Sequence, residues 1–453
     1  MATKSSKDPT VTIYGLKGMN NLTAPPAPLV DRQGRVTPHF VVNADVMDSG
    51  VVKRATGYSL AKSLAGLHSL GGEEMGLSVM LGVRAGVLYR IEPASGTMVP
   101  LASVGPKSQM TYAEVNQKVY CSSAYWRGVY NLLTGGMESW GLPVPTVTPN
   151  VSLCAGNLPP GRYSICYTRF SGGLMSGNGP IRMIEFQDQA QGLQLNNLDD
   201  DFLVWMTQVN GGPLFIAGPD GSDQITNMVP DFNPLTSLNI IPPPCFTHFT
   251  FANGRFWGVS GRSLYHSEPN EYGDFGWFSR KADTFLEELV LVAPYNAGLY
   301  VSSRTSTWNL KGTEPEKMVM ERVGGGAIPG TLALAQIPAK LAGGGVPTQE
   351  FGELSMMPTP VWRSPRGWVV GTHSGHLILI TERHLKVSGR QQGASLFRVQ
   401  EGVSQIITSL WGVAQGSDGE TKAIFKDGKL FELPAAISGN LGLLYGCYAN
   451  LSS

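Results

Sequence analysis

The chain has 453 residues, enough for about three average domains or for one large β-structure. Only 15% of its residues are charged, whereas 56 are glycine and 31 are proline, a composition that favours short strands and many turns. The 34 basic and 34 acidic side chains cancel, so no global positive field would hold nucleic acid or an anionic membrane. This argues against a dedicated nucleic-acid binder, and the weakly charged surface favours an oligomer or assembly subunit.

Neither a signal peptide nor a membrane anchor is predicted. No apolar stretch follows the lysines of MATKSSKDPTVTIYG, and the longest apolar runs, such as Leu289 to Pro294, are far shorter than the ~20 residues of a membrane span. The five cysteines have no CxxC spacing, which argues against a disulfide framework or a zinc site and predicts buried, reduced thiols in a chain made in the cytosol. They are Cys121, Cys154, Cys166, Cys245 and Cys447.

Six segments share one plan, in which a short apolar strand, a turn, a second strand, a Gly- or Ser-containing turn and a third strand follow one another. They begin at Leu67, Met110, Phe246, Glu288, Thr359 and Gln405. Three of the five steps between these starts are close to the length of a four-stranded propeller blade, about 40 to 45 residues. We therefore predict an all-β chain built as a β-propeller of about six blades. Helical patterning is limited to Thr284 to Val292, which also fits a strand, and Leu332 to Leu341.

The step from the second to the third segment exceeds one blade by roughly the length of a small β-sandwich. It contains an aromatic strand from Tyr163 to Phe170 and strands around a Gly211-Gly212 turn. We predict an N-terminal segment with the first blades over 1–143, an inserted fibronectin- or immunoglobulin-like sandwich over 144–240, and the remaining blades over 241–453. The stretches GGGAIPG and AGGGVPTQ predict a long Gly-rich loop at 324–355, with one short ordered element in LALAQIPAKL.

Two histidine motifs invite a chemical interpretation. His373 and His376 have a spacing that a metal site can use, but they flank a Ser-Gly turn without a Cys or acidic ligand, which favours a polar hairpin. His266 stands near Glu268 and Glu271, a set suited to acid-base chemistry. The turn residues between them and the lack of a linked nucleophile favour a blade loop instead.

The other candidates also favour structural roles. The run Asp199 to Asp201 lacks the alternation and Gly turn of a calcium loop, and Gly324 to Gly326 lacks the rest of a phosphate-loop motif. Tryptophans recur at strand ends, which favours core positions between blades over a carbohydrate platform. Examples are Trp126, Trp257, Trp308, Trp362 and Trp411. The sequence therefore predicts no catalytic, cofactor-binding or metal-binding residue, and no cofactor.

The opening GLKGMNNLTAPPAPL and VVNADVMDSGVVKRATGYS resemble the N-terminal signature of the tail-nozzle (tail tubular) proteins of short-tailed bacteriophages. LPPGRYSICYTRFSGGLMSGNGP resembles the fibronectin-like insertion of that family, and GRFWGVSGRSLYHSEPNEYGDF and VWRSPRGWVVGTHSGHLILITERHL resemble two of its blades. The resemblance runs in order from about residue 13 to 433, whereas LGLLYGCYANLSS has no counterpart. The signature residues are Asn43, Asp45, Asp48, Gly50, Arg54, Gly57 and Tyr58.

The resemblance implies a structural protein of the virion tail, not an enzyme, assembled in the cytoplasm of a bacterial host. Several copies, six in the expected ring, would surround a channel below the portal and adaptor, with tail fibre or spike proteins as further partners. Viral DNA would pass through this channel without specific binding, which suits a neutral chain. Two alternatives stay open. One is a peripheral receptor-binding or decoration protein of the virion, and the other is a β-propeller glycosidase or lyase, which would need paired carboxylates at its pore.

Overall fold

The computed structural model of the protein describes residues 67–411, except 73–75, 106–108, 172–173, 188–190, 197, 218–222, 229–232, 274, 277–284, 338–341, 344–357, 380–391 and 401–402. Outside this range it gives the backbone of short strands only. These are β1 (Leu29–Val30), β2 (Val36–Thr37), β3 (Ala44–Val46), β4 (Val52–Arg54), β36 (Ala423–Lys426), β37 (Lys429–Glu432) and β38 (Ala449–Asn450). Strands β3 and β4, which carry part of the predicted N-terminal signature, pair antiparallel.

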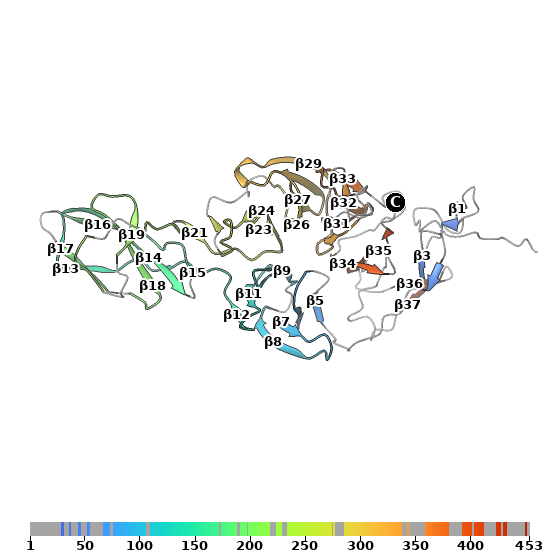
Figure 1. The fold of residues 1–453 in the computed structure, drawn as a ribbon, viewed down its shortest axis with the longest axis horizontal. Coiled ribbons are helices and arrows are strands. Elements are labelled where there is room, and N and C mark those ends of the chain that lie inside the picture. Colours follow the sequence, from blue (N-terminus) through green and yellow to red (C-terminus); the bar gives the residue numbers. More distant parts are fainter. Residues whose placement is uncertain are drawn as a thin grey trace, which may run out of the picture. The chain divides into compact units, whose positions relative to one another are not determined.

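Antiparallel strands make up almost all of the regular structure (Figure 1), which confirms the all-β prediction. The described residues add one short 3-10 helix, η3 (Pro315–Lys317). Both segments with helical patterning contain strands, because β26 covers Leu289–Tyr295 and β30 covers Ala333–Ala335. The backbone contacts divide the chain into two compact units, residues 1–100 with 287–453, and residues 101–286.

In the unit of residues 101–286, two sheets are simple meanders. One has the order β12-β11-β10-β9 and the other the order β22-β23-β24. Their strands are β9 (Thr111–Val115), β10 (Lys118–Ser122), β11 (Arg127–Asn131), β12 (Met137–Glu138), β22 (His248–Ala252), β23 (Arg255–Ser260) and β24 (Ser263–His266). Strands β21 (Ile240–Ile241) and β25 (Phe275–Gly276) pair with each other and flank the second meander in sequence. The turn between β22 and β23 follows from local chemistry, since Asn253 and Gly254 have φ of 52° and 72°, and a type I′ turn requires positive φ at both positions.

One aromatic cluster joins these two meanders although more than a hundred residues separate them in sequence. Tyr120 of the first sheet and Phe256 of the second lie 4.5 Å apart between ring centroids. Trp140 packs edge-on against Phe249, and its indole Nε1 donates to the backbone oxygen of Tyr272 at 2.7 Å. The chain therefore leaves the first meander and returns against it before it continues.

The intervening residues 151–225 form two sheets of their own. One has the order β13-β17-β20, and the other has the order β15-β14-β18-β19, with β16 also pairing with β14. The strands are β13 (Val151–Leu158), β14 (Gly161–Ser171), β15 (Leu174–Met175), β16 (Arg182–Phe186), β17 (Gln191–Leu195), β18 (Phe202–Thr207), β19 (Leu214–Ile216) and β20 (Gln224–Ile225). Both sheets contribute to one core, with Tyr163, Tyr167 and Met206 from one and Leu158 and Leu193 from the other. The predicted boundaries at 143/144 and 240/241 stay predictions.

The unit of residues 1–100 with 287–453 contains four larger sheets. Their orders are β5-β6-β7-β8, β26-β27-β28-β29, β30-β31-β32-β33 and β34-β35-β38. The remaining strands are β5 (Leu67–Gly71), β6 (Met80–Arg84), β7 (Val87–Ile91), β8 (Met98–Ser103), β27 (Gly298–Ser303), β28 (Ser306–Lys311), β29 (Val319–Gly325), β31 (Thr359–Ser364), β32 (Gly367–Gly371), β33 (Leu377–Leu379), β34 (Gln392–Gln400) and β35 (Val403–Trp411).

Burial changes across these sheets from one edge to the other. Every residue of β27, β31 and β32 is buried, whereas most residues of β29 are exposed. Two clusters join successive sheets: Tyr300 and Trp362 meet in one, and Val361 and Ile406 belong to the other. A meander whose central strands are buried on both faces suits a blade between two others. The blade number and the closure of a propeller stay predictions.

The Gly-rich stretch after residue 324 differs in part from the predicted loop. Gly324 and Gly325 belong to β29, and the chain soon re-enters a sheet at β30; residues 338–341 and 344–357 lie outside the described part. A Cβ atom at Gly326 would lie 2.2 Å from the backbone carbon of Arg304. Glycine is needed here because two backbones touch, which is a packing requirement rather than a requirement for flexibility.

Candidate functional site

The turn that contains His373 and His376 joins two sheets. The backbone N–H of Asn296 donates to His373 Nδ1 at 3.1 Å, and His373 Nε2 lies 3.2 Å from Thr359 Oγ1. Because Nδ1 accepts, the proton of the neutral ring lies on Nε2 and points to Thr359. His376 contributes to this contact between the sheets through its backbone oxygen, which accepts from the Tyr300 hydroxyl at 3.1 Å. The side chain of His376 is exposed. Both nitrogens of the His373 ring thus have hydrogen-bond partners within the fold, which fits the predicted polar hairpin.

His266 and its neighbouring carboxylates each have other partners and do not interact as one group. His266 is 3% exposed, and its ring packs against Trp257 with Nδ1 3.2 Å from the backbone oxygen of Ser267. Glu268 pairs instead with Arg255, at 3.4 Å. The chain pairs Glu268 with Glu271 through a backbone bridge, so this segment is a turn, as predicted.

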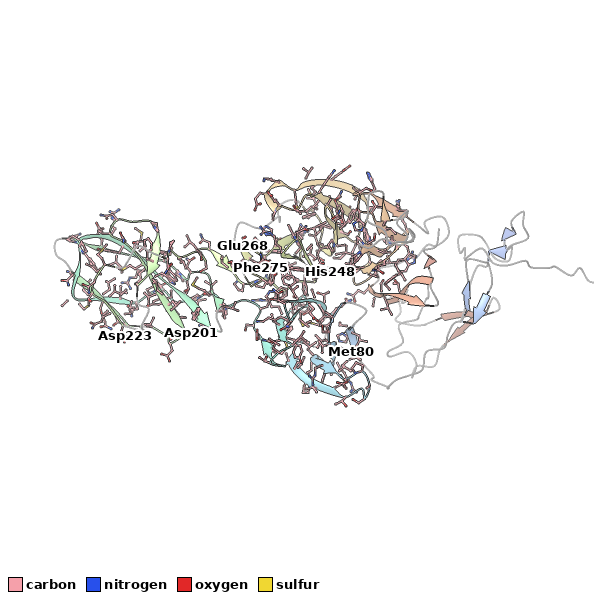
Figure 2. The ribbon with its side chains drawn as sticks, viewed as in Figure 1. Met80, Asp201, Asp223, His248, Glu268 and Phe275 are labelled. Carbon is pink, nitrogen blue, oxygen red and sulfur yellow. The ribbon has the colours of Figure 1, made fainter. Side chains whose placement is uncertain are left out.

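The aspartate run belongs to the turn that leads into β18. Asp201, labelled in Figure 2, pairs with Arg169 Nη1 at 3.0 Å, and the backbone oxygen of Asp199 accepts from Phe202. Asp199 and Asp200 are exposed. Within the described residues, no group of three or more His, Cys, Asp or Glu side chains is arranged to hold a metal ion.

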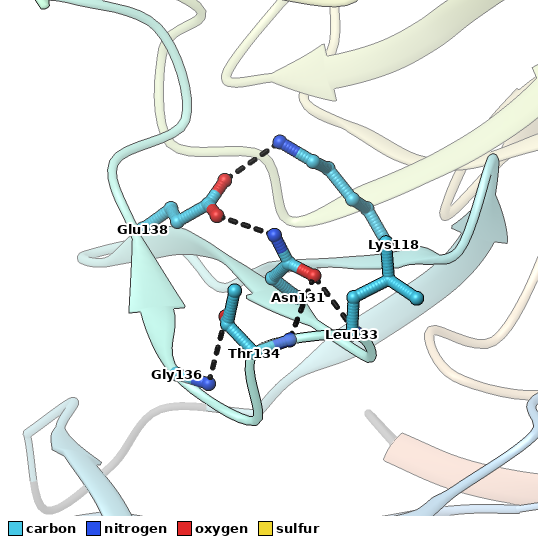
Figure 3. A network of polar contacts seen from close by, with 6 residues as sticks. All are labelled: Lys118, Asn131, Leu133, Thr134, Gly136 and Glu138. Atoms are coloured by element: carbon cyan, nitrogen blue, oxygen red, sulfur yellow. Dashed lines mark hydrogen bonds and ion pairs between the residues drawn. The ribbon is translucent and has the colours of Figure 1, made fainter. Parts of the chain in front are cut away.

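A fourth polar cluster lies around the turn between β11 and β12 (Figure 3). Glu138 accepts from Lys118 Nζ at 2.7 Å and from Asn131 Nδ2 at 2.6 Å, and these hydrogen bonds lower the pKa of its carboxyl. Asn131 Oδ1 in turn accepts from the backbone of Leu133 and Thr134. This carboxylate is therefore already used to hold a turn.

The described cysteines and tryptophans serve mainly as packing groups. Cys121 and Cys166 are fully buried, and burial raises the pKa of the Cys166 thiol to about 12, which leaves it inert. Cys121, Cys154, Cys166 and Cys245 are all free thiols, but Cys154 and Cys245 are half-buried, which differs from the predicted burial, because neither lies in the centre of a packed sheet core. Trp257 and Trp362 are fully buried, which confirms their predicted core positions, whereas Trp126 and Trp308 are half-buried. Cys447 and the side chain of Trp411 lie outside the described residues.

The sequence analysis missed an arginine-lined pocket between sheets β26–β29 and β30–β33. It has a volume of about 620 Å³. Its lining is Arg304, Thr305, Arg322, Gly324, Gly325, Gly326, Ser364, Pro365, Arg366, Val369, Leu377 and Leu379. We name these residues the arginine pocket. The three arginines come from the β27–β28 turn, from β29 and from the β31–β32 turn, so no local motif marks them in the sequence.

Hydrogen bonds position part of this pocket. Arg322 Nη2 donates to Ser306 Oγ at 2.8 Å, which holds one side of the guanidinium. Glu287, which is outside the lining, accepts from the hydroxyls of Ser303 and Thr305. The Ser303 and Thr305 hydrogen bonds, followed by the charge of Arg322, lower the pKa of the Glu287 carboxyl, so this group is an anion at neutral pH.

No known family model and no curated protein matches the chain. Solved structures with some likeness include the AfRom2 CNH domain, with 8% identity over 73% of this chain and 90% of that chain and a TM-score of 0.23. The extracellular domain of the one-component system BT4673 from B. thetaiotaomicron shows 11% identity over 82% of this chain and 59% of that one, with a TM-score of 0.21. Puromycin hydrolase shows 12% identity over 77% of this chain and 59% of that chain, with a TM-score of 0.19.

In the described residues, no helix has the length and apolar character needed to cross a membrane.

Proposed function

We propose that the chain is a structural subunit of a bacteriophage tail nozzle. The observation that carries the proposal is the order of the sheets along the chain. Two meander sheets, β5–β8 and β9–β12, come first, then the two-sheet segment of residues 151–225, and then four more sheets that begin at β22, β26, β30 and β34. This is the order in which the sequence motifs resemble blades and the fibronectin-like insertion of the nozzle family.

In the proposed architecture, six meanders are the blades of one propeller and residues 144–240 are an inserted fibronectin- or immunoglobulin-like sandwich. The aromatic cluster around Trp140 supports this arrangement, because it packs the meander before the insertion against the meander after it. The separate core of the 151–225 sheets supports an insertion that folds on its own.

A nozzle subunit needs a rigid frame rather than reactive groups. The candidate motifs fit such a frame, because His373 connects two sheets, Glu138 holds a turn and Asp201 pairs with Arg169. Six copies side by side would enclose the channel for DNA, with an adaptor above and fibre or spike proteins around the ring. A chain with zero net charge would let DNA slide without strong capture by its phosphates.

Assembly and location test this proposal. Light scattering and electron microscopy of the purified full chain, alone and mixed with the adaptor of the phage that encodes it, should show closed rings with a central channel. Antibody labelling of virions should mark the tail tip. Monomers under both conditions would contradict the ring, and label on the capsid or tail periphery would favour the receptor-binding or decoration alternative. Hydrolysis or lyase activity on a glycan would favour the enzyme alternative.

A further inference from the structure

We propose that the arginine pocket binds a small organic phosphate, such as a nucleotide. The inference does not rest on the nozzle proposal, because it uses only residues of the unit that contains β26–β33. The exposed residues Arg304, Arg322 and Arg366 line one open pocket of about 620 Å³. Among the described residues the pocket lining includes no carboxylate, but the carboxylate of Glu287 lies next to it, bound to the hydroxyls of Ser303 and Thr305, and a phosphate would have to bind on the side of the arginines away from Glu287.

Arginine is the residue type that suits a phosphate best. Its planar guanidinium carries five N–H donors in a fork that matches two phosphate oxygens. Arg322 is already held on one side by Ser306, which restricts the side chain while the other N–H groups are left for further partners. Thr305 donates to Glu287 and Ser364 donates to the backbone oxygen of Gly367, so these two hydroxyls already have acceptors, and the guanidinium of Arg322 is the group best placed to contact the anion.

The rest of the lining favours an organic ligand over a bare inorganic anion. Val369, Leu377 and Leu379 give the pocket an apolar wall, and Leu379 is 38% exposed. A phosphate ester could place its phosphate at the guanidinium groups and an apolar or aromatic part against this wall. At Gly325 a Cβ atom would meet nothing within 4 Å, so the backbone there leaves room.

The pocket also explains why its glycines are clustered. Gly326 allows the backbone that ends β29 to touch that of Arg304, and Gly324 lies where a Cβ would be 2.7 Å from Leu377. These close approaches bring the arginine of β29 and the arginine of the β27–β28 turn to one pocket. The Gly-rich stretch therefore shapes an anion site through close backbone packing, without a phosphate-loop motif.

Isothermal titration of the purified full chain at low ionic strength tests this inference, with adenosine monophosphate and inorganic pyrophosphate as probes. We expect the nucleotide to bind, and we expect Arg304→Gln, Arg322→Gln and Arg366→Gln each to weaken binding about tenfold, since a charged hydrogen bond is lost. Arg262→Gln is the matched control, because Arg262 is an exposed arginine in a hairpin turn outside the pocket and should bind as the wild type. Leu379→Ser should weaken the binding of the nucleotide more than the binding of pyrophosphate.

A second variant guards against loss of folding in the arginine variants. Gly325→Glu adds a carboxylate beside the arginines where a Cβ has open space, so the chain should fold and nucleotide binding should be lost. The proposal is overturned if neither probe binds the wild type or if Arg262→Gln weakens binding equally. It is also overturned if Gly325→Glu, or the variant that combines Arg304→Gln, Arg322→Gln and Arg366→Gln, binds as the wild type. Binding of pyrophosphate without the nucleotide would overturn the role given to the apolar wall.

Discussion

Replacement of His373 by alanine should destabilise the unit that contains β26–β33, although the residue has no predicted chemical role. His373 is 8% exposed, and its imidazole connects the Asn296 N–H to the Thr359 hydroxyl. Alanine leaves a small cavity and removes a partner of Thr359, which is fully buried. The expected loss is about 2–3 kcal/mol of unfolding free energy. For a unit of this size, that lowers the melting temperature by about 4–6 °C.

His376→Ala is the matched control because it lies in the same turn. Its side chain is exposed and its backbone makes the hydrogen bonds, so the expected change is within about 0.5 kcal/mol. His373→Asn should recover part of the loss, since its side-chain oxygen can accept from the Asn296 N–H. Urea unfolding followed by tryptophan fluorescence, with calorimetry, measures all three. Equal stability of His373→Ala and His376→Ala would refute the connecting role of His373.

Packing at Gly326, burial of His248 and the separate core of the 151–225 sheets each give a further test. Gly326→Ala should lower the unfolding free energy by about 2 kcal/mol or more in urea, because the new Cβ would meet the Arg304 backbone. Gly325→Ala is the control and should change the unfolding free energy by less than about 0.5 kcal/mol. Equal effects of the two substitutions would contradict the packing role of Gly326. Burial lowers the pKa of His248 from 6.5 to about 4, so the folded state favours the neutral ring. The contribution of this group to stability is complete above pH 6.5, and about 3 kcal/mol of unfolding free energy is lost as the pH falls towards 4. His248→Gln should reduce this loss in acid unfolding curves. Excision of residues 144–240 with a short linker should leave a β-rich remainder that still unfolds cooperatively by circular dichroism, and gradual melting would count against an inserted domain.

The sequence determined the features that depend on neighbouring residues. Short alternating runs and turn residues predicted strands, and Asn253-Gly254 makes a turn because those two residues tolerate positive φ wherever the rest of the chain lies. The same local reasoning predicted that the turn at His373 and His376 is a polar hairpin. It also placed Trp257 and Trp362 in the core, since large apolar rings at strand positions are buried when sheets pack together.

Tertiary structure decided what depends on residues far apart in sequence. Local pattern does not show that His373 joins Asn296 to Thr359, or that three arginines from separate strands and turns line one pocket. Gly326 looks like part of a flexible loop in sequence, yet its lack of a side chain is needed because the Arg304 backbone occupies that space. Backbone conformation is governed by adjacent residues, whereas close contact and the grouping of charges are set by how sheets pack, and packing exists only in the folded chain.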